Sequence, residues 1–337
     1  MAAKRKGSGK KSNAKIQRKS LRASQAAATP PKTTLPIVLL FREQQKMRNA
    51  VALQRAQRYA AYLKQVDNPT EPPKLGMALR ALAPAGSKRA LRILAEGDSC
   101  FDYPLPVPTG DGVIHQLQTL LGYSIANMAY YGLEVEQMMG LAIRQEIISR
   151  LSDPNMRYDA LLFSGGGNDL VGDQFCIWLK EVTPVPPPAQ LLDLAAVGAI
   201  LSLLEAEYRE LIRLRDKFSP QTVIFVNEYD FPPVTGKGVC GKGPWLKPSL
   251  DYVYKQLGVI NPNPNDEFVV VKTLLQQFAA MLGRIAADPT VTRFVVVPTQ
   301  GTLKPDPTDW QNEIHPTSGG FTKIAKKFQT ALAATFP

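Results

Sequence analysis

Beyond about residue 90, short apolar runs alternate with longer stretches in which apolar residues recur at helical spacing. This alternation is typical of βα units that build a parallel sheet. The apolar runs predict strands at Leu91–Ala95, Ser124–Ala129, Ala160–Phe163, Thr222–Val226 and Arg293–Val297. The longer stretches predict helices at Val113–Leu121, Glu134–Leu151, Leu191–Lys217, Val269–Ala287 and Thr322–Ala334. We therefore expect a three-layer α/β domain over residues 90–337.

Two long segments rich in proline or glycine interrupt this alternation. The first covers residues 171–190 and the second covers residues 231–248. Irregular segments of this length inside a compact domain are frequently functional. We expect both to form walls of a substrate site and the second to act as a flexible lid. Candidate substrate contacts in or beside the second segment are Tyr229, Asp230 and Trp245.

The part of the chain before residue 90 has a different texture. Residues 1–34 consist largely of Lys, Arg, Ser, Ala and Gly, a composition that buries too little apolar surface to offset its ordering entropy. We expect them to form a disordered basic tail. Residues 35–89 are expected to contain a basic helix, at 42–65, and then a linker marked by Pro69, Pro72, Pro73 and Pro84.

The net charge of +11 is concentrated in this first part. Residues 1–92 carry 21 Lys and Arg against three acids, whereas the rest of the chain is acidic. Short basic clusters contact phosphates without reading sequence, so residues 1–34 are a candidate for non-specific polyanion contact. An anionic membrane surface, a targeting role and a plain solubilising tail are the alternatives.

Several classes of protein are disfavoured by composition. The longest apolar runs fall short of the roughly 18 to 20 residues that cross a membrane, so no transmembrane segment is expected. Three cysteines without C-x-x-C spacing argue against a disulfide framework and favour a reducing compartment such as the cytoplasm. The basic N-terminus is also compatible with organellar targeting. With two histidines in the chain, a histidine-rich metal site is not expected.

Polar clusters follow the predicted strands. The first strand leads into Gly97-Asp98-Ser99, the second is followed by Gly132, and the third leads into Gly166-Gly167-Asn168-Asp169. His315 lies just before the last predicted helix. Ligands of open α/β sheets bind beyond the carboxyl ends of the strands, so these groups can meet at one edge. Together they supply a serine nucleophile, a base and oxyanion donors.

These blocks, in this order, resemble the SGNH (GDSL-type) hydrolase family. The resemblance rests on residues 97–99, 127–132 and 166–169 and on His315-Pro316, and it covers about residues 90–335. It implies a flavodoxin-like, parallel five-stranded sheet in an α/β/α fold. It also implies that Ser99 is the nucleophile and His315 the general base, with an oxyanion hole formed by the Ser99 and Gly132 N–H groups and the Asn168 side chain.

One position departs from the family pattern. The family usually has Asp three residues before the histidine, and this chain has Asn312 there. An asparagine oxygen can accept the imidazole N–H and fix the tautomer, although it lacks the charge that stabilises an imidazolium. Asn312 is therefore the preferred orienting residue, and Asp309 and Glu313 are the alternatives.

The function expected from these residues is hydrolysis of carboxylic esters through an acyl-enzyme intermediate, with a small-molecule or acylated ester as substrate. This serine chemistry needs no metal or organic cofactor, so none is expected. A carbohydrate O-deacetylase of the same fold is the alternative among enzymes. In a different class, the chain would be a catalytically silent SGNH-fold module tethered to a polyanion by its basic arm. The absence of an acid at residue 312 keeps that alternative open.

Overall fold

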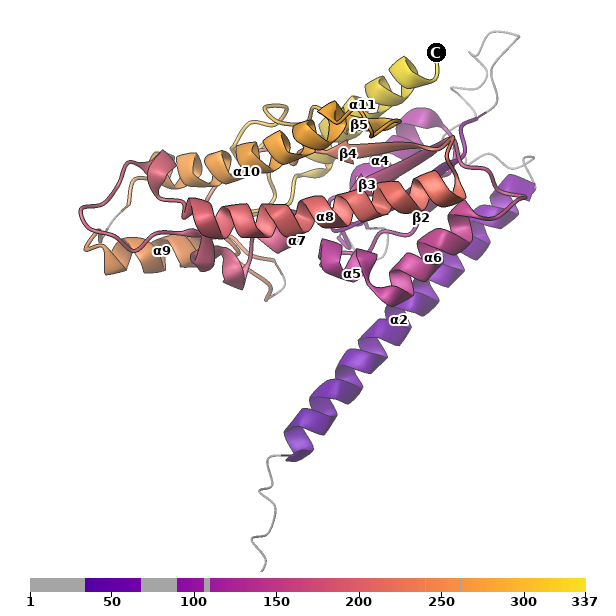
Figure 1. Ribbon diagram of the computed structural model, residues 1–337. Helices are drawn as coiled ribbons and strands as arrows, with labels where there is room; N and C mark the ends of the chain where they lie inside the picture. Colours follow the sequence, from indigo (N-terminus) through magenta and orange to yellow (C-terminus); the bar gives the residue numbers. More distant parts are fainter. Residues whose placement is uncertain (1–33, 68–89, 106–109, 240, 261) are drawn as a thin grey trace, which may run out of the picture. The chain divides into compact units, whose positions relative to one another are not determined.

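A parallel sheet of five strands, in the order β2-β1-β3-β4-β5, organises the chain (Figure 1). The computed structural model describes residues 34–67, 90–105, 110–239, 241–260 and 262–337. The tail predicted at 1–34 and the linker predicted before residue 90 lie almost wholly outside the described residues. The chain divides into two compact units, residues 1–52 and 53–337, and the sheet belongs to the second.

The five strands lie close to their predicted positions, and the predicted fold class is confirmed. Short, nearly continuous apolar runs form strands that are buried on both faces, as is usual in parallel sheets. Burying one Val, Leu, Ile or Phe side chain contributes about 1.5 to 3 kcal/mol, so these runs favour the sheet strongly. The strands are β1 (Ile93–Gly97), β2 (Ala126–Asn127), β3 (Ala160–Ser164), β4 (Val223–Asn227) and β5 (Phe294–Val297).

Helices cover both faces of the sheet, and the alternation of side chains along the strands divides the core in two. On β1, Leu94 faces the first core, while Ile93 and Ala95 face the second. The first core includes buried side chains of α5 (Val135–Met139), α6 (Leu141–Leu151), α8 (Leu194–Phe218), α9 (Lys247–Gln256) and α10 (Pro264–Ala287). The second includes those of α4 (Val113–Leu121) and α11 (Ser318–Thr335).

Local signals explain where the helices begin and end. The helix predicted at Glu134–Leu151 is divided at Gly140 into α5 and α6. The side chains of Asp193 and Thr317 accept backbone N–H groups in the first turns of α8 and α11, and Thr317 places the start of α11 one turn before the predicted start. A short helix, α7 (Gly167–Leu170), lies directly before the first long segment, and the segment itself contains two 3-10 turns, η1 (Asp173–Trp178) and η2 (Pro188–Gln190).

Helix α2 (Thr34–Asp67) covers the segment for which a helix was predicted at 42–65. In its part that belongs to the second unit, Arg55, Tyr59 and Tyr62 are buried. Their spacing of four and three residues places them on one face of the helix. Tyr59 and Tyr62 belong to the first core, so this end of α2 is part of the α/β unit.

Among the described residues, one helix, α10, is long and apolar enough to cross a membrane by length and composition. Nine of its side chains are buried, and Val270, Leu274 and Phe278 are among the fully buried ones in the first core. A core helix of an α/β domain passes the same test of length and composition, and the packing of α10 is that of a core helix.

Candidate active site

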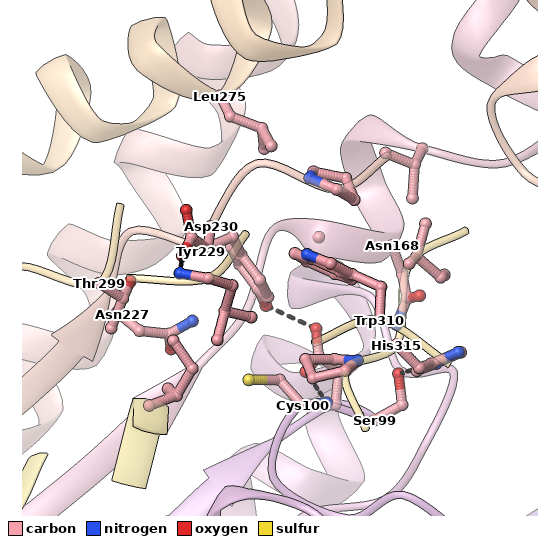
Figure 2. A pocket seen from close by; sticks show the side chains of 18 residues that line it. Ser99, Cys100, Asn168, Asn227, Tyr229, Asp230, Leu275, Thr299, Trp310 and His315 are labelled. Carbon is pink, nitrogen blue, oxygen red and sulfur yellow. Dashed lines mark hydrogen bonds between the residues drawn. The ribbon is translucent and has the colours of Figure 1, made fainter. Parts of the chain in front are cut away.

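The carboxyl ends of β1 and β3 bring residues 97–99 and residues 166–169 together. The two strands pair in parallel with Gly97 opposite Ser164, so the residues that follow each strand leave the sheet at the same level. Ser99 comes two residues after one strand, and Asn168 comes four residues after the other. Both line one cavity, and His315 also lines it, from the loop before α11 (Figure 2).

Glycine is required at the end of β1 because the backbone of β3 passes very close. A Cβ on Gly97 would lie 2.8 Å from the carbonyl oxygen of Ser164, which is shorter than real Cβ contacts. The amide of Asp98 donates to the same carbonyl at 3.1 Å. Any larger residue at position 97 would therefore push the Ser99 loop away from the sheet.

Ser99, His315 and Asn312 form a continuous hydrogen-bonded chain. His315 Nε2 lies 2.9 Å from Ser99 Oγ, and His315 Nδ1 lies 3.0 Å from Asn312 Oδ1. Asn312 Oδ1 also accepts the backbone N–H groups of Ile314 and His315, which fixes it as the oxygen. Because an amide oxygen only accepts, Nδ1 carries the imidazole proton and Nε2 is left to accept from Ser99.

The imidazole of His315 is enclosed by aromatic rings. Tyr103 lies 4.5 Å away between ring centroids, and Trp245 meets the imidazole edge to face at 5.3 Å. The side chain is buried, and this desolvation lowers the pKa of His315 to about 4. The imidazole is therefore neutral at pH 7 and has the protonation state that a general base needs.

Asp309 and Glu313, the two alternative orienting residues, are engaged away from the imidazole. The Asp309 carboxylate pairs with Lys323 at 2.6 and 2.7 Å and accepts the backbone N–H of Lys304. The Glu313 carboxylate accepts four backbone N–H groups from the second long segment and the start of α9. Of the three candidates, Asn312 is the one whose side chain contacts His315.

The four hydrogen bonds to Glu313 fix the backbone of the segment 231–248, which was expected to act as a flexible lid. The amides that donate to Glu313 belong to Gly236, Trp245, Leu246 and Lys247, at 2.5 to 3.1 Å. The backbone N–H of Glu313 in turn donates to the carbonyl of Lys237 at 3.0 Å. Glu313 therefore holds the segment 231–248 near its start, at Gly236, and at its end, at residues 245–247, against the loop that carries His315.

Two of the three predicted oxyanion donors are backbone amides with no acceptor among the described residues. These are the N–H groups of Ser99 and Gly132, and Gly132 has a φ of 80°, which suits glycine. Asn168, the third, donates one amide proton to the carbonyl oxygen of Leu133 at 2.8 Å. An amide group carries two donors, so a second one remains on Asn168.

Asp98 and Asp169 brace the loops on which these groups lie. Asp98 accepts from Tyr229 Oη at 2.5 Å, from Ser164 Oγ at 3.2 Å and from the backbone of Cys100 at 2.9 Å. Desolvation raises the pKa of Asp98 to about 6. Asp169 accepts the backbone N–H of Val135, and burial raises its pKa to about 7.

The three predicted substrate contacts fall into two groups. Tyr229 and Asp230 line the cavity, but their polar atoms are used within the protein. The Tyr229 hydroxyl donates to Asp98, and the Asp230 carboxylate accepts the backbone N–H groups of Gly301 and Leu303. Trp245 packs against His315.

The cavity beside Ser99 has a volume of about 70 Å³ and mostly apolar walls. Two buried polar atoms of its lining residues, Asn227 Oδ1 and Trp310 Nε1, have no partner among the described residues. In Figure 2, Asn227 and Thr299 lie on the opposite side of the cavity from Ser99. Neither Asn227 nor Thr299 was predicted to be a site residue, although both lie at the carboxyl ends of predicted strands.

Within the described part of the chain, no group of three or more His, Cys, Asp or Glu side chains is arranged to hold a metal ion. Cys100 lines the cavity, but burial raises the pKa of its thiol far above the ordinary value. Among the described residues that line the cavity, the Ser99 hydroxyl is the group that lies at hydrogen-bond distance from the imidazole of His315.

No family model and no curated protein matches the sequence, whereas many solved structures match the fold. The lipase Lip_vut3 from a goat rumen metagenome has a TM-score of 0.46 and 16% identity, with 72% of this chain and 97% of that chain covered. An extracellular lipase from Streptomyces rimosus has a TM-score of 0.42 and 16% identity, with 72% and 100% covered. A family 3 carbohydrate esterase from Clostridium thermocellum has a TM-score of 0.39 and 15% identity, with 73% and 97% covered.

Proposed function

We propose that the protein is an SGNH-type ester hydrolase that works through an acyl-enzyme intermediate. The observation that carries the proposal is the chain of hydrogen bonds from Ser99 through His315 to Asn312. A serine hydroxyl becomes nucleophilic when an adjacent base accepts its proton, and His315 Nε2 lies at hydrogen-bond distance with its lone pair free to do so. The strand order and the cavity that Ser99, Asn168 and His315 line together support the proposal.

In the first half of the reaction, Ser99 Oγ attacks the ester carbonyl carbon and its proton moves to His315 Nε2. The carbonyl oxygen becomes an oxyanion, for which the N–H groups of Ser99 and Gly132 and the free amide proton of Asn168 are the donors. When the tetrahedral intermediate collapses, the bond to the alcohol oxygen breaks and His315 returns the proton to that oxygen. Water then attacks the acyl-enzyme by the same steps and releases the acid and Ser99.

The cavity beside Ser99 suits a short acyl group. An apolar cavity of about 150 Å³ holds a benzene molecule, so a volume of about half that size accommodates roughly two to four carbon atoms. Acetyl to butyryl esters fit this size. Esters of long fatty acids would need a groove leading outward.

An activated serine can be detected without knowing the natural substrate. The experiment is to treat the wild type, Ser99→Ala and His315→Ala with a fluorophosphonate probe and to locate the adduct by mass spectrometry. We expect stoichiometric labelling of Ser99 in the wild type and none in Ser99→Ala. His315→Ala should react at least about 100-fold more slowly, because the serine proton then has no acceptor.

The same experiment separates this proposal from a catalytically silent SGNH-fold module. A folded wild-type protein that is not labelled, or full esterase activity in Ser99→Ala, would refute the proposed reaction.

A second candidate function, removal of acetyl groups from carbohydrates, is favoured by the small cavity. The hydrolysis rates of p-nitrophenyl acetate, butyrate and octanoate show which length of acyl chain the site accepts. Rates of acetate release from an acetylated oligosaccharide then test whether a sugar is accepted as the alcohol. A strong preference for octanoate would exclude both the short acyl site and the deacetylase.

A further inference from the structure

A fully buried carboxylate lies directly before the nucleophile block. Glu96 is the fourth residue of β1, and its side chain has no exposed surface. Because side chains alternate along a strand, Glu96 lies on the same face of the sheet as Leu94, within the first core. A carboxylate at such a position is costly unless it is paired, and burial raises the pKa of Glu96.

The partner of Glu96 comes from helix α2. Arg55 contacts Glu96 through two nitrogens, with Nη2 2.6 Å from Oε2 and Nη1 3.3 Å from Oε1. Its Nε donates to Glu146 of α6 at 2.9 Å. Arg55 is 2% exposed, so the pair is enclosed by the protein. The backbone N–H of Gly97 also donates to the Glu96 carboxylate, which connects the pair to the nucleophile loop.

Arg58, one turn further along α2, contacts two loops of the candidate site. Its guanidinium donates to the carbonyl oxygen of Ala129 at 3.0 Å and pairs with Asp102 at 3.0 Å. Ala129 comes three residues before Gly132, and Asp102 comes three residues after Ser99. Arg58 therefore connects the loop of one oxyanion donor to the loop of the nucleophile.

These two loops are also joined through their backbones. The amide of Tyr130 donates to the carbonyl of Gly97 at 2.9 Å, which connects the two loops. Within the nucleophile loop, the amide of Asp102 donates to the carbonyl of Asp98 at 3.0 Å. The two arginines add contacts from outside the sheet to the same short stretches of chain. None of these groups touches the hydroxyl of Ser99 in the structure, so their effect on it acts through the loops.

We propose that Arg55 and Arg58 of helix α2 are positioning residues that hold the Ser99 loop and the Gly132 loop in their reactive geometry. The inference rests on the proposed function. Arg55 acts through Glu96 at the base of the nucleophile loop, and Arg58 acts through Ala129 and Asp102. The end of a basic N-terminal helix is thereby part of the catalytic apparatus of the α/β unit.

Arg58→Ala is the first test, because Arg58 is 30% exposed and its loss leaves no fully buried charge unpaired. Arg209→Ala is the matched control. Arg209 lies on α8, is also partly exposed and forms two ion pairs, one with Glu205 and one with Asp288. We expect kcat for p-nitrophenyl butyrate to fall about 10- to 100-fold in Arg58→Ala with KM nearly unchanged, because small displacements of reacting groups have effects of that size. Arg209→Ala should retain wild-type values.

Arg55 needs a different design, since removing it alone would leave the buried carboxylate of Glu96 without its cation and strongly destabilise the protein. The pair Arg55→Gln with Glu96→Gln removes both charges, keeps the size of the side chain at position 96 and leaves a shorter, still polar side chain at position 55. We expect a folded protein with kcat reduced at least about ten-fold, because the guanidinium fork that sets the geometry is lost. Wild-type kcat in this double variant would show that the pair only balances charge and would overturn the role of Arg55.

Hydrogen–deuterium exchange provides a readout that does not depend on activity. We expect faster exchange in peptides covering residues 97–103 and 128–133 in Arg58→Ala, and not in Arg209→Ala. Unchanged exchange and unchanged kcat together would overturn the inference. If the wild type hydrolyses no ester and takes up no fluorophosphonate, the proposed function fails, and the exchange data still decide whether the arginines order the two loops.

Discussion

At the scale of single residues, the site differs from a Ser-His-Asp triad in one atom of one side chain. Asn312 Oδ1 accepts the imidazole N–H and two backbone N–H groups, so the amide holds the ring and the tautomer as a carboxylate would. It provides no negative charge to an imidazolium. Burial without such a charge explains why the pKa of His315 is lowered to about 4.

This electrostatic difference predicts the effect of Asn312→Asp. A carboxylate beside Nδ1 favours the protonated ring and raises the pKa of His315. Since activity requires the neutral ring, it is lost as the pH falls through that pKa. We expect the acid limb of kcat/KM, near pH 4 in the wild type, to move upward by about one to two pH units in Asn312→Asp.

The measurement is a pH–rate profile with p-nitrophenyl acetate from pH 3.5 to 8. Asn263→Asp is the matched control, because it makes the same chemical change at the N-cap of α10, where Asp caps as well as Asn. Identical acid limbs in the wild type and Asn312→Asp would show that another group controls the loss of activity.

At the scale of elements, Glu313 is the connection between the histidine loop and the segment 231–248. Its carboxylate is fully buried and accepts four backbone N–H groups. Glu313→Ala removes the acceptor and leaves four buried or half-buried donors without one. We expect the free energy of unfolding to fall by about 2 to 4 kcal/mol, as judged by urea denaturation.

Limited proteolysis should report the same change locally. Lys237 and Lys242 are exposed in the segment, so trypsin should cut there faster once Glu313 no longer holds the backbone. Glu205→Gln, which alters a partly exposed carboxylate on α8, is the control. Equal cleavage rates in the wild type and Glu313→Ala would mean that the segment is held by other contacts.

The elements that could be predicted from the sequence are those whose signal is local. The apolar runs that became β3 and β4 and the helix Val113–Leu121 carry their own periodicity and breakers, so their positions followed directly. Helix α9 was missed because it begins at Lys247-Pro248, inside the segment 231–248 that is rich in glycine and proline. The division at Gly140 was missed because one glycine within a helical pattern is usually tolerated.

The candidate site shows the same distinction. The sequence could predict Ser99, Asn168 and His315 as site residues. Each lies at a strand end or in the last loop, and the topology of the sheet alone brings these positions to the site. The roles of Glu313 and Arg55 could not be predicted, because both depend on contacts between residues more than 40 positions apart in the chain. A Glu inside an apolar strand was the one visible signal that a buried cation had to be nearby.

At the scale of the whole molecule, charge is divided unevenly between the two compact units. Residues 1–52 carry 13 Lys and Arg and one acid, whereas residues 53–337 carry 27 basic and 28 acidic residues. We propose that the basic segment makes non-specific contact with polyanions, because such contact needs clustered positive charge and no particular sequence.

Removal of residues 1–33 tests this contact. We expect the truncated chain to lose most of its retention on heparin at about 0.15 M salt and to keep its esterase activity and melting temperature. The control is the full-length chain with its first ten Lys and Arg replaced by Ser, which keeps the length and removes the charge. Undiminished retention in the truncated chain would place the basic surface elsewhere.

The four amides that converge on Glu313 also constrain how this protein can diverge. A segment of another length in place of residues 231–248 would have to present N–H groups at the same points, or the loop that carries His315 would lose its support. A change of substrate specificity during evolution is therefore easier to reach by substituting side chains on the cavity wall than by inserting or deleting residues in this segment. In homologues that keep a carboxylate at this position, the length of the segment should vary little, while its side chains vary freely.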